Sequence, residues 1–339
     1  MIDIDFEVLR NIGLNQGIAN LLYAMPEPPS GSQLARITSV HRDRATLDDG
    51  HREHNAATVP GCVPVVGDWA LHAGGRITAL LPPLSQLARR SADGQRQALA
   101  SNVDTALLVM GLDHDFNLRR LERYLTLAQG VDVLVVLTKA DMDIAVDDKL
   151  EQLRRRLPPS INTLAVNATA PETPQLLAPW LGAGQTLILL GSSGAGKSTL
   201  TNALAASHQA TGGVRLGDGR GRHTTTARSL HRCLGGACVI DTPGLRSWQP
   251  DTDEATLAAS FDDIEALAGH CQFRDCSHAS EPGCAVRCVV DADRLFNYNK
   301  LLREVRRAGQ TPLDRIAERN KWKVLMKAVG ARDRAKRGG

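Results

Sequence analysis

Residues 185–199 read QTLILLGSSGAGKST, and this stretch predicts both a buried strand and a binding loop. The apolar run at 186–190 is typical of a strand inside a sheet, and residues 191–198 match the pattern G-x-x-x-x-G-K-[ST]. Residues 199–206 then favour a helix, with leucines four positions apart on one face. Strand, glycine-rich loop and helix in this order are the context that a phosphate-binding loop requires. We therefore expect a nucleoside triphosphate to bind here.

Each residue type in this loop suits the binding of phosphate. The glycines allow backbone N–H groups to turn toward phosphate oxygens, and the helix N-terminus adds partial positive charge. Lys197 is expected to pair with the β- and γ-phosphates, and the Ser198 hydroxyl to coordinate Mg²⁺. The residues of this stretch assigned to nucleotide binding are Gly191, Ser192, Ser193, Gly194, Ala195, Gly196, Lys197, Ser198 and Thr199.

A second motif, TKAD, follows the apolar run at 131–137 and predicts which base is bound. The Asp141 carboxylate can accept hydrogen bonds from N1–H and the 2-amino group of guanine, whereas adenine offers no such donor pair. The motif resembles the NKxD element of GTPases, with Thr138 in place of Asn. We assign Thr138, Lys139, Ala140 and Asp141 to guanine nucleotide binding.

A third motif, DTPG at 241–244, matches the DxxG element of GTPases, whose Asp holds the Mg²⁺ shell and whose Gly meets the γ-phosphate. Before it lies GRGRHTTT at 219–226, a flexible loop whose threonines can close onto Mg²⁺ only while γ-phosphate is present. Thr226, Asp241 and Gly244 are therefore assigned to nucleotide binding, and Thr225 is grouped with Lys197 as catalytic. Residues 229–233 and 237–240 are expected to form an antiparallel pair that links the two loops.

The order of these motifs is unusual, because GTPases ordinarily carry the phosphate loop first and the guanine motif last. Here Asp141 precedes Lys197. Strand runs at 105–110, 131–137 and 163–166 alternate with helical stretches at 117–129, 147–157 and 172–181, which predicts a parallel sheet covered on both faces. A circular permutation preserves such a sheet, since the site requires spatial proximity and not sequence order.

The region before the sheet has a different pattern. Residues 1–30 look peripheral, with a short helix near 14–23. Short strand candidates at 35–40, 45–47, 70–72 and 77–80, separated by glycine and aspartate turns, fit a five-stranded barrel of the OB type. A generic β-barrel without a nucleic-acid role fits the pattern equally well.

Near the C-terminus, Cys271-x4-Cys276-x-His278-x5-Cys284 supplies three thiolates and one imidazole. Such a set predicts a closed tetrahedral zinc site that is structural, because no position stays open for water. Cys288 is an alternative ligand, and a scattered set of reduced cysteines is the alternative to a metal site.

Charge is distributed unevenly along the 339 residues. Residues 294–339 contain 14 Lys and Arg against 4 Asp and Glu, whereas the whole chain has a net charge of only +3. A basic tail on an acidic body indicates a polyanionic partner, with a solvated charged helix as the alternative. No apolar stretch is long enough to span a bilayer and the N-terminus is unlike a secretion signal, so we expect a cytoplasmic protein without a membrane partner.

The order TKAD, GSSGAGKST, HTTT and DTPG, between a small barrel and the EPGCAV stretch at 281–286, resembles the RsgA family of circularly permuted GTPases, which act in small-ribosomal-subunit maturation. The resemblance implies a multidomain α/β protein, a monomer that hydrolyses GTP to GDP and contacts the small subunit and its rRNA. It also favours Cys284 over Cys288 as the last zinc ligand. The expected parts are an N-terminal extension at 1–32, an OB-fold barrel at 33–83, a circularly permuted GTPase domain at 84–248, and a zinc-binding, mainly helical, basic region at 249–339.

Hydrolysis is expected to be slow without a partner. Many GTPases orient the attacking water with a Gln after DxxG, and Leu245 at that position cannot hydrogen-bond water. His223, beside the threonines of the flexible loop, is the candidate catalytic residue that the family resemblance also suggests. A GTP-sensing RNA-binding adaptor with negligible turnover and a general RNA-remodelling NTPase remain the alternatives.

Overall fold

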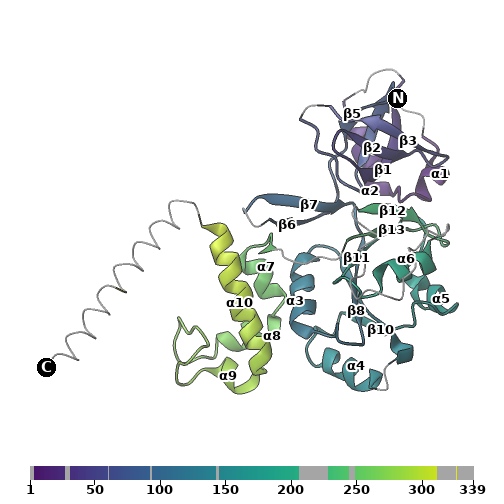
Figure 1. Ribbon diagram of the computed structural model, residues 1–339. Helices are drawn as coiled ribbons and strands as arrows, with labels where there is room; N and C mark the ends of the chain where they lie inside the picture. The colour runs from purple at the N-terminus through teal and green to yellow at the C-terminus, as the bar shows by residue number, and fades with distance from the viewer. Residues whose placement is uncertain are drawn as a thin grey trace.

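The computed structural model describes residues 4–26, 31–59, 61–91, 94–142, 145–205, 228–243 and 249–310, and also Met326. Figure 1 shows a small β-barrel on top of a central α/β body, with a group of helices beside that body. Within the described parts of the chain, no helix has the length and apolar character that a membrane span requires.

The barrel is built from short strands that close on themselves, because β1 pairs with both β2 and β4. The strand order is β1-β2-β3-β5-β4. Ile37, Leu47 and Ile77 are fully buried in its interior. The strands are β1 (Gln33–Val40), β2 (Arg44–Asp48), β3 (Glu53–Ala57), β4 (Trp69–Ala73) and β5 (Arg76–Leu80). A five-stranded barrel is therefore confirmed. Strand β3 was not predicted, because its sequence, EHNAA, contains no β-branched residue and no Phe, Tyr or Trp.

The N-terminal residues are not peripheral, and that prediction is wrong. Helices α1 (Phe6–Arg10) and α2 (Gln16–Ala24) flank a turn that contains Ile12 and Leu14. These two side chains and Ile18 of α2 are fully buried in the main core. Buried Arg36 of β1 donates to the carbonyl oxygens of Ile12 (2.7 Å) and Asn102 (3.1 Å). The N-terminal helices thus join the barrel to the central body.

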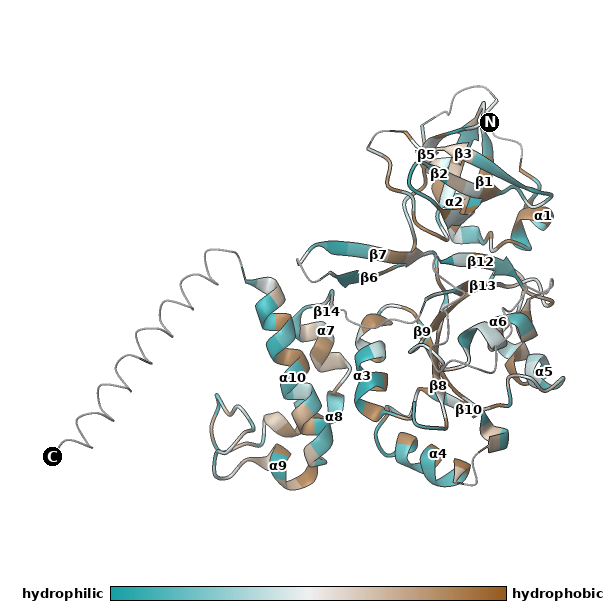
Figure 2. Ribbon diagram, in the orientation of Figure 1, coloured by the Kyte–Doolittle hydropathy of each residue, from teal (hydrophilic) through white to brown (hydrophobic). Residues whose placement is uncertain are grey.

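The central body contains the predicted parallel sheet, in the order β10-β9-β8-β11-β13. Successive residues of one strand point to opposite faces of the sheet and belong to different hydrophobic clusters. Leu189 and Leu190 of β11 are an example, so both faces of the sheet are covered. Figure 2 shows the hydrophobic colour concentrated on these inner strands. The strands are β8 (Thr105–Gly111), β9 (Asp132–Thr138), β10 (Asn162–Ala165), β11 (Thr186–Leu190) and β13 (Cys238–Asp241).

Helices connect these strands close to the predicted positions. They are α3 (Leu118–Leu127), α4 (Val146–Arg154), α5 (Thr173–Leu177) and α6 (Lys197–Leu204), with short 3-10 turns η1 (Ala140–Met142) and η2 (Ala178–Trp180). The helix after the glycine-rich loop begins at Lys197, earlier than predicted, because the loop itself closes at Gly196.

One sheet runs through the barrel and the body. Strand β12 (Ser229–Arg232) pairs antiparallel with β13, as predicted, and on its other edge with β1 of the barrel at Ser39 and Ser229. Arg232 also forms an ion pair with Asp48, a buried carboxylate of β2. A hairpin of β6 (Gln86–Arg90) and β7 (Arg96–Ser101), extended by β14 (Gln249–Pro250), was not predicted, since its sequence is rich in Arg and Gln.

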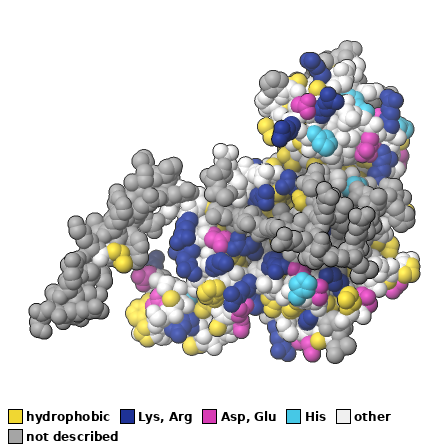
Figure 3. All heavy atoms as spheres, in the orientation of Figure 1, with side chains coloured by type: hydrophobic (Ala, Val, Ile, Leu, Met, Phe, Trp, Pro, Cys, Tyr) yellow, Lys and Arg dark blue, Asp and Glu magenta, His cyan; other side chains and the backbone are white. Residues whose placement is uncertain are grey.

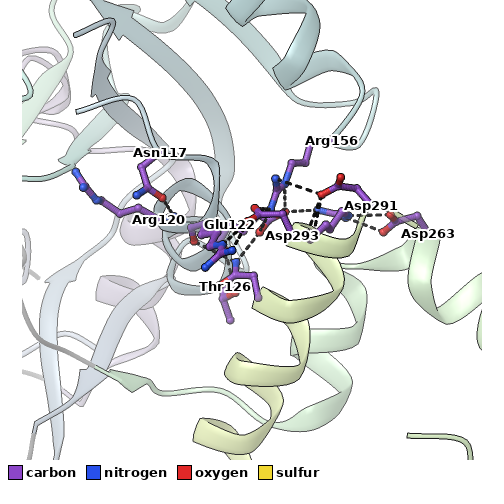
Figure 4. A network of polar contacts seen from close by, with 11 residues as sticks. Asn117, Arg120, Glu122, Thr126, Arg156, Asp263, Asp291 and Asp293 are labelled. Carbon is purple, nitrogen blue, oxygen red and sulfur yellow. Dashed lines mark hydrogen bonds and ion pairs between the residues drawn. The ribbon is translucent and has the colours of Figure 1, made fainter. Parts of the chain in front are cut away.

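The C-terminal helices form a separate small core against α3. They are α7 (Glu254–Ala259), α8 (Asp262–Ala268), α9 (Ala285–Val289) and α10 (Ala292–Gly309), and Leu257, Phe261, Ile264 and Leu301 are fully buried among them. Glu122 of α3 accepts hydrogen bonds from α10, as Figure 4 shows. The predicted helix beginning near Asp293 is confirmed as α10, whereas the basic residues predicted beyond 310 lie outside the described residues.

Candidate functional site

The glycine-rich loop connects β11 to α6, and two of its glycines are required by close packing. A Cβ at Gly191 would lie 2.3 Å from the carbonyl oxygen of Val109. Gly196 caps α6 with φ +89°, and a Cβ there would lie 3.0 Å from Oγ1 of Thr138. The loop can therefore follow this path only with glycine at both positions.

Lys197 is buried, and its ammonium lies across the loop. Nζ donates to the carbonyl oxygens of Ser192 (2.6 Å) and Gly191 (3.1 Å). Burial lowers the pKa of Lys197, while the carboxylates of Asp241 and Asp115 act in the opposite direction. A charged group in such surroundings gains most from an anionic partner, and phosphate oxygens are partners of this kind.

The TKAD motif contacts the glycine-rich loop although more than fifty residues separate the two in the chain. The Thr138 hydroxyl donates to the Ala195 carbonyl oxygen (2.7 Å), and Lys139 Nζ donates to that of Gly194 (2.9 Å). Lys139 has φ +62°, a strained conformation for a residue with a side chain. Asp141, in η1 just beyond this contact, is exposed and available to a ligand.

Asp241 and Ser198 meet at the end of β13. The Ser198 hydroxyl donates to Oδ2 of Asp241 (3.2 Å), while Oδ1 of the same carboxylate is buried and has no hydrogen-bond partner among the described residues. Burial raises the pKa of Asp241, and Lys197 opposes this shift. A buried carboxylate oxygen without a partner next to a serine hydroxyl fits a hydrated Mg²⁺ ion. Thr199 lies beside Ser198 in the first turn of α6.

Two carboxylates after β8, Asp113 and Asp115, belong to no motif and were not predicted. Asp113 forms an ion pair with Lys139 (2.7 Å). Buried Asp115 accepts from the backbone N–H of Gly111 (3.1 Å) and is also bonded by the Ser192 hydroxyl and the Arg120 guanidinium. The available signal was their place just beyond a parallel strand, at the sheet edge where ligands bind.

Four predicted site residues cannot be placed. His223, Thr225, Thr226 and Gly244 lie outside the described residues, as does Leu245.

The cysteine and histidine cluster is assembled in the C-terminal region. The ligand atoms of Cys271, Cys276, His278 and Cys284 all lie within 4.8 Å of one another. Nδ1 of His278 is 3.6 Å from Sγ of Cys271 and 3.5 Å from Sγ of Cys284, and the two sulfurs are 3.9 Å apart. Tetrahedral zinc with Zn–S bonds of about 2.3 Å requires sulfur separations of about 3.7 Å. The residues therefore fit zinc, and Cys288 is exposed and outside the cluster.

Comparison with known proteins identifies the family. Residues 81–251 match the family model described as RsgA GTPase. A protein of Xanthomonas campestris pv. campestris named small ribosomal subunit biogenesis GTPase RsgA is 47% identical over 280 residues, which cover 79% of this chain and 77% of that protein. The chain belongs to the RsgA GTPase family. The family predicted from the motifs is thereby confirmed, and RsgA proteins are GTPases.

Solved structures agree with an RsgA-type fold. YjeQ from Thermotoga maritima aligns with a TM-score of 0.60 at 22% identity, covering 83% of this chain and all of that one. YloQ, described as a circularly permuted GTPase, aligns with a TM-score of 0.55 at 20% identity, covering 85% of this chain and all of that one. These likenesses support the architecture of barrel, permuted GTPase domain and C-terminal helical region.

Proposed function

We propose that this protein hydrolyses GTP during late assembly of the small ribosomal subunit, and that the subunit stimulates hydrolysis. The observation that carries the proposal is the contact between the TKAD motif and the glycine-rich loop, with Thr138 and Ala195 joined at 2.7 Å. That contact brings the TKAD motif, which ends in Asp141, and the glycine-rich loop to one sheet edge. The name of the Xanthomonas relative indicates the subunit as the partner.

The nucleotide would be held at three points. Asp141 would accept the N1–H and 2-amino hydrogens of guanine, and the stem of Lys139 would cover the base and ribose. Lys197 would exchange its bonds to Gly191 and Ser192 for bonds to the β- and γ-phosphates. Mg²⁺ bound with GTP supplies a positive charge at the phosphates, and Ser198 and Asp241 would hold it.

The roles of the loop residues rest on sequence. Thr225 or Thr226 would close onto Mg²⁺ while γ-phosphate is present, and the Gly244 N–H would meet the γ-phosphate. His223 would orient the attacking water, because Leu245 cannot. A His223→Ala protein stimulated by small subunits as strongly as the parent would contradict this role.

The Cys271, Cys276, His278 and Cys284 set would hold one structural zinc ion that ties the loop before α9 to the C-terminal core. The basic C-terminal region and the barrel would contact rRNA through phosphate groups. Such contacts position a protein without reading sequence, which suits docking on folded RNA.

The first experiment tests the base. An Asp141→Asn protein should bind GTP about 10- to 100-fold more weakly, since the charge-assisted hydrogen bonds from two guanine donors are lost. Xanthine carries a carbonyl where guanine carries its 2-amino group, and the Asn amide can donate to it, so XTP should bind this variant better than GTP. Exposed Asp148 on α4 provides the matched control, Asp148→Asn. Equal affinity of the parent for ATP and GTP would overturn the guanine assignment and favour a general NTPase.

The second experiment tests the partner. GTP turnover is titrated with purified small and large ribosomal subunits separately, and stimulation by the small subunit alone is expected. Absence of stimulated turnover, with GTP-dependent binding to the subunit retained, would favour the GTP-sensing adaptor.

A further inference from the structure

A cavity of about 610 Å³ lies between α3 of the central body and α10 of the C-terminal region, immediately beside the glycine-rich loop. Ser192 and Ser193 of that loop form part of its wall. Most of the remaining wall is polar or basic, with His114, Asn117, Arg119, Arg120, Arg123 and Lys300 among its lining residues. We call this cavity the α3–α10 cleft.

The arginines of the cleft are held in place by carboxylates. Arg120 pairs with Asp115, Arg123 with Glu304 (2.7 Å), and Arg119 with Asp293. Glu304 and Asp293 are not among the lining residues, whereas the arginines are. A guanidinium has more N–H donors than one carboxylate uses, so Arg119 and Arg120 are positioned and still able to donate.

Lys300 adds a charge that is not neutralised locally. It is exposed on α10, and the ion pairs found in the described part of the chain include none to its ammonium. Figure 3 shows dark-blue Lys and Arg side chains gathered on the same face, over the region of α3 and α10 in Figure 1. Among the described residues, the lining therefore contains three arginines, one lysine and a single carboxylate, that of Asp115.

We propose that the α3–α10 cleft binds backbone phosphates of RNA. Planar guanidinium groups that are already oriented match the oxygens of a phosphodiester, and an ammonium at the rim adds a point charge. The volume admits a nucleotide unit, whereas a small anion would leave most of it filled by water. The choice of RNA over another polyanion rests on the proposed function, in which the ribosomal subunit is the partner.

The cleft is connected to the nucleotide site through one carboxylate. Asp115 is bonded both by Arg120, which lines the cleft, and by the Ser192 hydroxyl of the glycine-rich loop. A phosphate that draws the Arg120 guanidinium toward the cleft competes with Asp115 for it and changes how Asp115 holds Ser192. RNA in the cleft thereby acts on the loop that binds the nucleotide phosphates.

The test measures the affinity of the full chain for a fluorescein-labelled RNA duplex of about 16 base pairs, the length that one double-stranded-RNA-binding domain spans. Fluorescence anisotropy gives the affinity over a range of KCl concentrations. The variant is the double change Arg120→Gln and Lys300→Gln. The matched control is Arg154→Gln with Arg155→Gln, which removes two exposed charges at the C-terminal end of α4. We expect the cleft variant to lose about 5- to 30-fold in affinity and about one to two units of salt slope, and the control to change less than about 2-fold.

Lys300→Gln alone provides a second test that does not depend on the folding of the double variant, because no described ion pair includes Lys300. It should lose about one unit of salt slope. Equal affinity and equal slope for the parent and both cleft variants would overturn the proposal, as would equal losses in the α4 control. Displacement of the duplex by GMP at matched ionic strength would also overturn it, by indicating a mononucleotide site. The parent's response to small subunits decides the proposed function separately, since the duplex measurement requires neither subunits nor GTP turnover.

Discussion

Glu122 of α3 and Arg294 of α10 form a buried ion pair, with 2.6 Å between Oε1 of Glu122 and Nη1 of Arg294. Glu122 is 1% exposed and also accepts from Arg156 (2.7 Å) and from Nδ2 of Asn297 (2.5 Å). Arg294 in turn reaches Asp263 of α8 (2.6 Å). Figure 4 shows this network between the central body and the C-terminal helices. A single carboxylate thus holds three donors from two parts of the molecule.

Glu122→Gln should destabilise the docking of the C-terminal region by about 3 kcal/mol, because it leaves the buried Arg294 and Arg156 without their shared counter-charge. Hydrogen exchange of the α7–α10 amides and urea unfolding measure the effect. Exposed Glu151→Gln on α4, which also pairs with arginines, should change stability by less than about 0.5 kcal/mol. Unchanged exchange in α10 would mean that apolar packing alone holds this region.

Asp115→Asn should weaken GDP and GTP binding by about 5- to 20-fold, since an amide keeps the shape but loses the charged bond to Arg120 that fixes its contact with Ser192. Because Asp115 acts through Ser192, we expect KM to rise more than kcat falls. Titration with a fluorescent GDP analogue and steady-state kinetics check this. Asp148→Asn is the control, and a variant that loses kcat at constant KM would contradict a positioning role.

The chain should bind one zinc ion, retained in Cys288→Ser and lost in Cys276→Ser. The reason is that Cys276 belongs to the cluster whose ligand atoms lie within 4.8 Å of one another, whereas Cys288 is exposed outside it. Elemental analysis of the purified proteins measures the metal, and a chelator should loosen α8 and α9 in hydrogen exchange. Loss of zinc in Cys288→Ser would reassign the ligands.

The stability of the barrel should fall as the pH drops below about 6.5, the ordinary pKa of an imidazole in the unfolded chain. Burial, followed by the adjacent His54, lowers the pKa of His72, while Asp49 acts in the opposite direction. The rings of His54 and His72 lie 4.5 Å apart, and Nε2 of His72 is buried with no hydrogen-bond partner in the described part of the chain. Below that pH the unfolded chain binds more protons than the folded one, so unfolding becomes easier, by at most about 1.4 kcal/mol per pH unit for one group.

Urea unfolding between pH 7 and 5, followed by a spectroscopic signal from the barrel, measures how the free energy of unfolding changes with pH. His72→Phe removes the titrating group and replaces the imidazole with an apolar ring. The free energy of unfolding of this variant should therefore change less with pH than that of the parent. An identical slope in the two proteins would assign the pH dependence to other groups.

Much of the candidate site was predictable, because each of its motifs requires particular residue types at a particular spacing. A phosphate loop needs its glycines, Lys197 and Ser198 within a few positions, and a zinc site needs its cysteines and histidine close together in the chain. The parallel strands were predictable for a similar reason, since residues buried on both faces form continuous apolar runs. Strands β3, β6 and β7 were missed because most of their residues are polar or alanine, although Leu87, Leu99 and Ala100 are buried. Neighbouring strands supply their stability.

The sequence by itself determined the family, the order of the motifs, the parallel sheet and the cluster of three cysteines and one histidine, because these depend on local patterns of residue type. Only the tertiary structure decided that Asp115 touches Ser192, that Glu122 joins two parts of the chain, that the N-terminal helices enter the main core, and that basic residues of α3 and α10 share one cleft. The physical reason is that these are contacts between distant segments, made by side chains common on any surface. Their meaning comes from packing, which brings segments together that no local pattern connects.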